Sequence, residues 1–253
     1  MDYDNLLNLA VELGYRLMSS GAEIYRVEES VDRLLRAYGL EQPQVFAIPN
    51  CLIVSVTTPE GHPITRLRRI PNHGTDVELL ERCNDLCRRL CSHPVALPEA
   101  QKEVEALGKD AKIYHPAQIL LGYGLAPAFF TPLFNGSMMD GLCAFFVGLA
   151  VGLLSLYGRR FIGANSFFRT VILSAVASLL ALFVVRFGIG HDVDAITIGV
   201  LMVLVPGTSL TKAMREIMAG DIISGISRMS EVILIATAIA LGAGAGLSVD
   251  RFL

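Results

Sequence analysis

The sequence predicts an α-helical membrane protein, with five transmembrane helices that follow an N-terminal cytoplasmic α+β domain. The 253 residues are 53% hydrophobic and have a mean hydropathy of +0.52, which is high for a soluble protein. Charge is unevenly spread, because residues 1–115 hold 13 basic and 17 acidic side chains while residues 116–253 hold 8 and 7. Apolar runs long enough to cross a bilayer occur only in the second part. We therefore expect a cytoplasmic domain at 1–115 and a membrane domain at 116–253.

The first 115 residues predict four helices and three strands. Apolar residues recur at helical spacing in Asn5–Met18 and again in Glu23–Tyr38. Thr75 is expected to cap a third helix that ends near Cys91, and Pro98 to start a fourth. Short runs rich in β-branched residues predict strands at Gln44–Ile48, Cys51–Thr57 and Ile64–Ile70. This order of elements is typical of a small α+β unit with its own core.

A polar string, GAEIYRVEE at residues 21–29, opens the second predicted helix. Gly21 precedes the helix, and Glu23, Arg26 and Glu28 follow within two turns. An ion-pair network on the helix surface is the simplest interpretation. The alternative is a ligand-binding or catalytic cluster, which would make the protein a membrane-anchored hydrolase or a sensor. The sequence contains no GxSxG, P-loop or HExxH motif, so we assign no catalytic residue.

Composition argues against several other classes of protein. Cys83, Cys87 and Cys91 recur every four residues, a helical stripe that we interpret as buried reduced thiols rather than a metal or redox site. The five histidines show no ligand spacing, so we expect no metal and no cofactor. A net charge of −3 provides no basic surface for nucleic acid. Because acidic residues stand where a signal peptide would be basic, we expect the N-terminal domain to remain in the cytoplasm.

Five apolar segments are expected in the second part, at about Ala117–Phe134, Gly141–Tyr157, Phe167–Phe187, Ala195–Met214 and Val232–Val249. Lysine and arginine cluster in alternate connections: Lys109 and Lys112, then Arg159, Arg160 and Arg169, then Lys212, Arg215 and Arg228. The intervening connections, 135–140 and 188–194, contain neither residue. The positive-inside rule therefore predicts that the N-terminus is inside and the C-terminus outside.

The fourth segment is interrupted at Pro206-Gly207. Pro206 removes a backbone donor and clashes with the preceding turn, and Gly207 leaves the backbone dihedrals free. A helix from Asp194 to Pro206 rises about 18 Å at ~1.5 Å per residue, against a hydrocarbon core of roughly 30 Å. The break is therefore expected inside the bilayer. A proline kink that merely aids packing is the alternative.

Beyond the break, Thr208 and Ser209 are expected to cap a second half-helix that carries Lys212 and Arg215. A helix N-terminus at membrane depth is tolerated where it is buried in protein or lines a wet cavity. Its exposed N–H groups favour an anion or a polar substrate, as in transporters with discontinuous helices. The break is thus the candidate substrate site.

The remaining polar candidates lie at the predicted outer ends of the helices: Asn135, Asp140, Asp192 and Asp194. Solvated loops explain them most simply, and an outer gate or proton site is the alternative. Small residues predict close helix packing, since Gly148 and Gly152 form a GxxxG pattern, and the fifth segment carries Gly242, Gly244 and Gly246.

Taken in order, these segments resemble the threonine/serine exporter family. They are GAEIYRVEE (21–29), NCLIVSVTT (50–58), FNGSMMDGL (134–142), PGTSLTKAMREIMAGD (206–221) and SGISR (224–228). The resemblance covers nearly the whole chain and is nearest to the N-terminal-type subunit of the family's split members. It implies a multi-pass protein of the bacterial inner membrane that exports threonine and serine or, as in split members, succinate. Because the chain ends after five segments, it also implies a separate small five-helix membrane subunit as partner.

Overall fold

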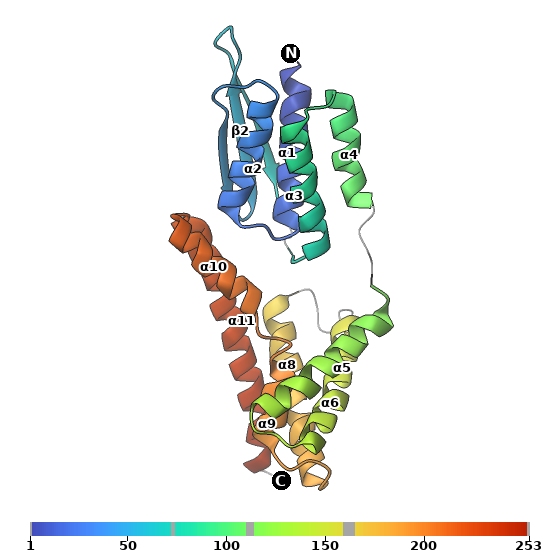
Figure 1. The fold of residues 1–253 in the computed structure, drawn as a ribbon. Coiled ribbons are helices and arrows are strands. Elements are labelled where there is room, and N and C mark those ends of the chain that lie inside the picture. The colour runs from blue at the N-terminus through green and yellow to red at the C-terminus, as the bar shows by residue number, and fades with distance from the viewer. Residues whose placement is uncertain (1, 72–73, 110–113, 159–164, 252–253) are drawn as a thin grey trace. The chain divides into compact units, whose positions relative to one another are not determined.

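The computed structural model describes residues 2–71, 74–109, 114–158 and 165–251 (Figure 1). Its contacts divide the chain into two compact units. Unit 1 comprises Met1–Lys112 and Leu210–Met229, and unit 2 comprises Ile113–Ser209 and Ser230–Leu253. The architecture is mostly helical with one small sheet. Lys112, Arg159 and Arg160, which the topology prediction used, lie outside the described residues.

Unit 1 contains the helices and strands that the N-terminal sequence predicts. These are α1 (Tyr3–Ser19), α2 (Ile24–Ala37), β1 (Gln44–Ile48), β2 (Cys51–Thr57), β3 (Pro63–Arg69), α3 (Val77–Ser92) and α4 (Leu97–Lys109). The predicted cap of α3 is wrong by one residue. Asp76, not Thr75, holds the N-cap position, and its carboxylate accepts a hydrogen bond of 2.9 Å from the Leu79 N–H. Unit 1 also takes in most of α10 (Gly207–Ala219) and the first residues of α11 (Ile222–Ser248).

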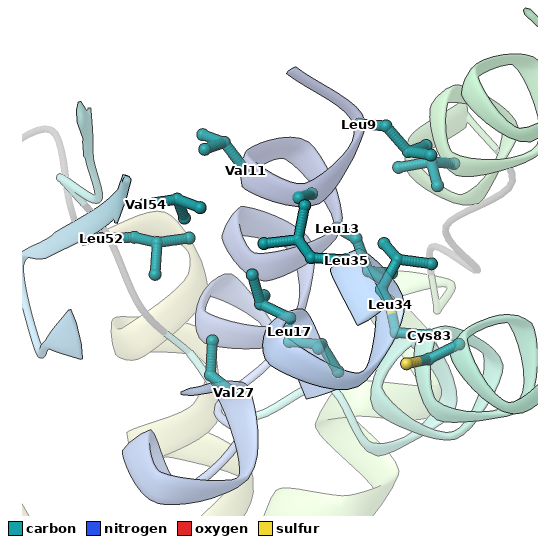
Figure 2. Packing of buried hydrophobic residues seen from close by; sticks show 14 of the residues in the cluster. Leu9, Val11, Leu13, Leu17, Val27, Leu34, Leu35, Leu52, Val54 and Cys83 are labelled. Atoms are coloured by element: carbon teal, nitrogen blue, oxygen red, sulfur yellow. The ribbon is translucent and has the colours of Figure 1, made fainter. Parts of the chain in front are cut away.

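The sheet is antiparallel in the order β1-β2-β3, and α1 and α2 pack on one of its faces. Leu52 and Val54 of β2 point into this core beside Leu13, Leu17 and other leucines of the helices (Figure 2). Gly14 of α1 permits the close approach, because a Cβ atom there would overlap with the Leu52 side chain. The predicted α+β core is therefore present.

Unit 2 is formed by α5 (Pro116–Leu133), α6 (Met138–Tyr157), α8 (Ser166–Arg186), α9 (Val193–Leu201), the rest of α11 and a short 3₁₀ turn, η1 (Val249–Arg251). Within the described ranges, three helices are long and apolar enough to cross a membrane, namely α6, α8 and α11. Helix α5 contains Pro127 and Pro132, and α9 has nine residues. Five membrane spans and their orientation therefore remain predictions. Helix α11 begins at Ile222, ten residues before the predicted fifth segment.

Small residues bring the helices of unit 2 together, as predicted. A Cβ atom on Gly148 would overlap with the Tyr123 carbonyl of α5, and one on Gly152 would lie 2.7 Å from the Tyr123 Cβ. On α11, a Cβ on Gly242 would overlap with Ser174 and Val171 of α8. Gly244 differs, since a Cβ there would meet no described atom within 4 Å. Glycines on one helix face thus replace side chains where backbones approach closely.

Candidate functional site

The predicted interruption of the fourth segment is present in the structure. Helix α9 ends at Leu201, a turn follows, and α10 begins at Gly207. The prediction that Thr208 and Ser209 cap α10 is wrong, because both lie inside its first turn. Pro206 precedes the first helical residue, where its missing N–H has no helical role. Gly207 and Thr208 are exposed, and a Cβ on Gly207 would meet no atom within 4 Å.

In unit 1, α10 contacts the polar string of residues 21–29 through charged side chains. The Glu23 side chain, only 8% exposed, accepts a hydrogen bond of 3.1 Å from Arg215 Nη1. Arg26 Nε lies 3.5 Å from the other oxygen of Glu23. Lys212 Nζ lies 3.5 Å from the hydroxyl of Thr75. The candidates of the polar string and those of α10 therefore form one charged cluster, although Glu23 and Arg215 are 192 residues apart in the sequence.

The centre of this cluster is a buried ion pair that sequence reasoning missed. Glu216 is fully buried, and its carboxylate accepts two hydrogen bonds from Arg228, of 3.1 Å from Nε and 2.9 Å from Nη2. The same carboxylate lies 3.4 Å from the Ile24 N–H, at the first residue of α2. Glu23 holds the N-cap position of α2, but its side chain accepts no capping hydrogen bond. The Glu216 carboxylate lies at this helix N-terminus instead. We name Glu23, Arg215, Glu216 and Arg228 the α10 latch.

One sequence signal pointed to the latch. Glu216 lies in a stretch that carries Lys212, Arg215 and Arg228 and one other acidic residue, Asp221, and it shares a helix face with the buried Ala213. An acidic side chain on the inward face of an amphipathic helix requires a buried partner. Hydropathy alone had instead assigned the start of α10 to a membrane segment.

Gly21 is required where the α1–α2 turn meets α10. Its φ of +91° lies in the left-handed region that favours glycine. A Cβ atom there would overlap with the Gly74 carbonyl and lie 2.9 Å from Lys212 Nζ. The Gly74 N–H donates to the Ser19 carbonyl, and the Asp76 N–H donates to the Ser20 carbonyl. These two hydrogen bonds hold the segment before α3 against the α1–α2 turn.

Two further carboxylates border the latch. Glu28 accepts a hydrogen bond of 2.7 Å from the Ala47 N–H of β1, and burial raises its pKa, with a smaller contribution from the charge of Asp221. Burial also raises the pKa of Asp221, and the neighbouring Glu216 charge adds to the rise. The Asp221 Oδ2 atom is buried and has no hydrogen-bond partner among the described residues. The Asp221 carboxyl group therefore binds its proton more tightly than an exposed aspartate does.

The polar residues at the other candidate position, in unit 2, have a structural role. Asp140 is 1% exposed and accepts hydrogen bonds from Ser137 Oγ (2.7 Å), the Ser137 N–H (2.9 Å), the His191 N–H (2.6 Å) and the Asp192 N–H (3.2 Å). Asp192 caps α9 by accepting from the Asp194 and Ala195 N–H groups. Asp194 is exposed, as is Asn135, which has a φ of 65° in the turn after α5. The carboxylates of Asp140 and Asp192 thus hold the α8–α9 connection against the start of α6.

The cysteine stripe lies where the helical spacing predicts. Cys83 and Cys87 are buried and Cys91 is half-buried, all as free thiols. Burial raises the pKa of the Cys83 thiol to about 11 and that of Cys87 to about 12. Cys87 and Cys91 line a groove of about 740 Å³ between α2 and α3, which Arg26 also borders. Thiols with such high pKa values are poor nucleophiles at neutral pH.

Metal binding has no evident centre, since no group of three or more His, Cys, Asp or Glu side chains in the described part of the chain is placed to hold an ion.

Comparison with known proteins gives a consistent result. The model of the family described as "Putative threonine/serine exporter" (ThrE) matches residues 8–250. The "Probable threonine/serine exporter" of Mycobacterium tuberculosis is 24% identical over 243 residues, which is 94% of this chain and 45% of the relative. The "Threonine/serine exporter" of Corynebacterium glutamicum is 22% identical over 255 residues, covering 98% of this chain and 52% of the relative.

Fungal proteins are similar as well. "Pheromone-regulated membrane protein 10" of the yeast Debaryomyces hansenii is 27% identical over 243 residues, which is 92% of this chain and 23% of the relative. This chain thus spans between about a quarter and a half of these three relatives. No solved structure matches. Because the family model matches almost from end to end, the chain belongs to the threonine/serine exporter family, a family of membrane proteins.

Proposed function

We propose that this chain is a subunit of a secondary exporter of small carboxylate-bearing metabolites, either threonine and serine or a succinate-type dicarboxylate. The family and three apolar helices support a membrane exporter. The observation that carries the proposal is the break between α9 and α10, where a polar first turn, Gly207 to Ser209, begins a helix that carries Lys212 and Arg215. Helix N-termini of this kind favour a carboxylate. The bacterial relatives named as threonine/serine exporters support the cargo class.

The cargo would meet backbone N–H groups in the first turn of α10. Because Thr208 and Ser209 lie within that turn, their hydroxyls are available to the cargo rather than committed to capping. Lys212 follows one turn later and adds positive charge, which a dicarboxylate uses more than a zwitterionic amino acid. Energy would come from the proton gradient, since the sequence carries no nucleotide-binding motif.

The α10 latch gives the N-terminal domain a mechanical role in this proposal. The domain binds α10 through Glu23 and through the Ile24 N–H, a few residues after the break. Release or rotation of α10 would therefore change the geometry of the proposed cargo site. The proposal therefore requires two states of the α10 latch, one with α10 bound to the N-terminal domain and one with α10 released or rotated.

A second membrane subunit completes the proposed transporter. The proposed partner is a separate five-helix subunit of the same family, and the chain itself spans about half the length of the bacterial relatives. The lipid bilayer surrounds both subunits, in the bacterial inner membrane with the N-terminal domain in the cytoplasm. We expect export only when both subunits are produced, and robust transport by this chain alone in liposomes would contradict the partnership.

The cargo site is tested by measuring export rate per inserted protein, for threonine and succinate separately. Gly207→Leu places an isobutyl group beside the first turn and should stop export of both while insertion is unchanged. Thr208→Ala with Ser209→Ala should weaken export roughly tenfold or more, because a hydrogen bond to a charged group is worth ~1.5–3 kcal/mol. Thr237→Ala with Ser248→Ala is the matched control, since these α11 hydroxyls bond to carbonyls of their own helix.

Lys212→Gln separates a role of its charge in cargo binding from a role in docking α10. A larger loss for succinate than for threonine would support a direct charge contribution to cargo binding. An equal loss for both would assign Lys212 to the docking of α10, through its contact with Thr75. Normal export by all the variants at residues 207–212 would place the cargo site elsewhere and reduce the break to a packing kink.

A further inference from the structure

The sheet of unit 1 has one face that the described helices leave open. Helices α1 and α2 cover the face of Leu52 and Val54. On the opposite face the strand register aligns Phe46, Ile53 and Leu67 directly across the three strands. Phe46 is 53% exposed and Leu67 is 65% exposed. Exposed apolar side chains that adjoin one another and are rimmed by polar residues are candidates for an interaction surface. We name Phe46, Ile53 and Leu67 the apolar row.

The rows on either side of the apolar row differ in chemistry. On one side, the register aligns Gln44, Ser55 and Thr65, and the hydroxyls of Ser55 and Thr65 lie 2.8 Å apart. On the other side it aligns Ile48, Cys51 and Arg69. These three rows contain one cation and no carboxylate. The two arginines between them on β3, Arg66 and Arg68, face the helices instead, where they pair with Asp4 and Glu12 of α1.

The edges of the sheet are less suited to a partner than its face. The outward N–H of Ala47 on β1 is already bonded to the Glu28 carboxylate. The other edge strand, β3, begins at Pro63 and carries three arginines. Proline and charge on edge strands oppose the addition of a further strand. A partner would therefore bind on the face and not extend the sheet.

We propose that this face binds the same face of a second copy of the chain, so that the two sheets form a sandwich around a twofold axis through Ile53. Such an interface is isologous, and each apolar row packs on its counterpart. The twofold axis also places the Arg69 row of one copy over the Gln44–Ser55–Thr65 row of the other. The cation of each copy then meets amide and hydroxyl acceptors, and the face is complementary to itself.

Repulsion between the two Arg69 side chains does not oppose this arrangement. Arg69 lies one strand and two residues from Ile53, which is about 8 Å at ~4.8 Å between strands and ~3.4 Å per residue. The twofold axis runs along the apolar row, so it doubles only the part of this separation that lies along the strands, from about 7 Å to about 14 Å between the two Arg69 positions, beyond the Debye length of about 8 Å at physiological ionic strength. Screening therefore removes most of the like-charge cost.

The size of the face predicts where the dimer forms. Three strands of about five residues cover roughly 14 by 17 Å, or about 240 Å², against about 800 Å² per partner in a stable complex. Dimerisation is therefore weak in dilute solution. It becomes effective when copies share one bilayer, since confinement raises the effective concentration as tethering does. The inference needs only that the chain is a membrane protein and is independent of the cargo.

The test is cross-linking of the full chain in native membranes with a short bismaleimide. Ile53→Cys, in a Cys51→Ser background, places two thiols at the twofold axis, where sheets packed about 10 Å apart are too distant for a direct disulfide but within reach of the cross-linker, and should yield a linked homodimer. Val77→Cys in the same background is the matched control, because Val77 is 69% exposed but lies on α3. We expect at least tenfold more dimer from Ile53→Cys than from Val77→Cys or from the background alone. Adding Phe46→Glu and Leu67→Glu to Ile53→Cys should reduce the dimer at least tenfold while the amount of inserted protein is unchanged.

Three results would overturn the proposal. Equal dimer from Ile53→Cys and Val77→Cys would indicate random collision. Absence of dimer from Ile53→Cys, with the thiol still reactive toward maleimide, would show that no second copy reaches the face. Cross-linking of Ile53→Cys to a different protein would assign the face to another partner.

Discussion

Glu216 and Arg228 hold opposite charges in a site from which water is excluded. Removing one partner of a buried pair leaves the other uncompensated, at a cost of about 3–5 kcal/mol. Arg228→Met should therefore lower the free energy of unfolding of the purified protein by this amount. Glu216→Leu with Arg228→Met removes both charges and should recover most of the loss. Arg33→Met is the control, because the Arg33–Glu29 pair is mostly exposed and is expected to contribute at most about 1 kcal/mol.

If the double variant were as unstable as Arg228→Met, the latch would contribute through its hydrogen-bond geometry and not through paired charge. Denaturant unfolding in detergent, followed by a probe in unit 1, distinguishes the two cases.

Asp221 predicts a pH dependence with a defined sign. Its pKa is raised in the folded protein above its ordinary value of 3.8. The protonated carboxyl therefore stabilises the fold below that value, and the contribution is lost as pH rises through the folded pKa. Asp221→Asn removes this titration, so its melting temperature should fall less than that of the unmodified protein between acid and neutral pH. Asp85→Asn, at an exposed carboxylate of α3, is the control for the loss of one surface charge.

An unchanged profile for Asp221→Asn would assign the titration to Glu28, whose pKa is raised by burial as well.

Sequence patterns predicted the burial of single residues better than their capping roles or their distant partners. The helical spacing of Cys83 and Cys87 predicted their burial correctly, since periodicity alone fixes which side of a helix faces the core. The caps Thr75 and Thr208 were misplaced, because several neighbouring polar residues can fill a cap and only local backbone geometry selects one. The pairing of Glu23 with Arg215 could not be predicted, as contacts over 192 residues leave no local signal.

Two glycines on one helix provide a test at the level of elements. Gly242 of α11 lies against the backbone of α8, whereas a Cβ on Gly244 would meet no described atom within 4 Å. Gly242→Val should destabilise the α8–α11 contact by about 1–3 kcal/mol, the usual cost of overpacking. Gly244→Val should be nearly neutral because a Cβ there meets no described atom within 4 Å, and the same glycine-to-valine change in the same helix makes the two variants comparable. Resistance to a denaturing detergent, measured for both variants, checks the difference.

Equal destabilisation by the two valines would mean that α11 is sensitive to valine along its length and that the close contact with α8 is not the cause. The sequence predicted that glycines line this helix, but it could not say which glycine faces a neighbour.

At the scale of the whole molecule, charge predicted the orientation of the chain. We expect a cytoplasmic N-terminus, a cytoplasmic connection at 158–166 and a periplasmic C-terminus, from the distribution of lysine and arginine. Reporter fusions at these three positions measure this directly. A cytoplasmic C-terminus would remove the five-span topology and the argument for a five-helix partner.

The contacts of the folded chain divide the predicted fourth segment in a way that hydropathy does not. The predicted fourth segment continued to Met214, but the residues from Leu210 belong to unit 1. Composition reports how apolar a stretch is, and α10 carries enough apolar residues to extend the run. Its position depends instead on the buried charge of Glu216 and on the α2 terminus that this charge serves.

The hydrogen bonds of Asp140 set an order of events during biosynthesis. Asp140 leaves the ribosome 51 residues before His191, whose N–H it accepts. At about 5–20 residues per second, the carboxylate waits roughly 3–10 s for this donor. During that interval Ser137 supplies the partners present in the nascent chain. Asp140 therefore gains its last two hydrogen-bond donors only after residues 191–192 have been synthesised, which is later than every residue of α5 and α6.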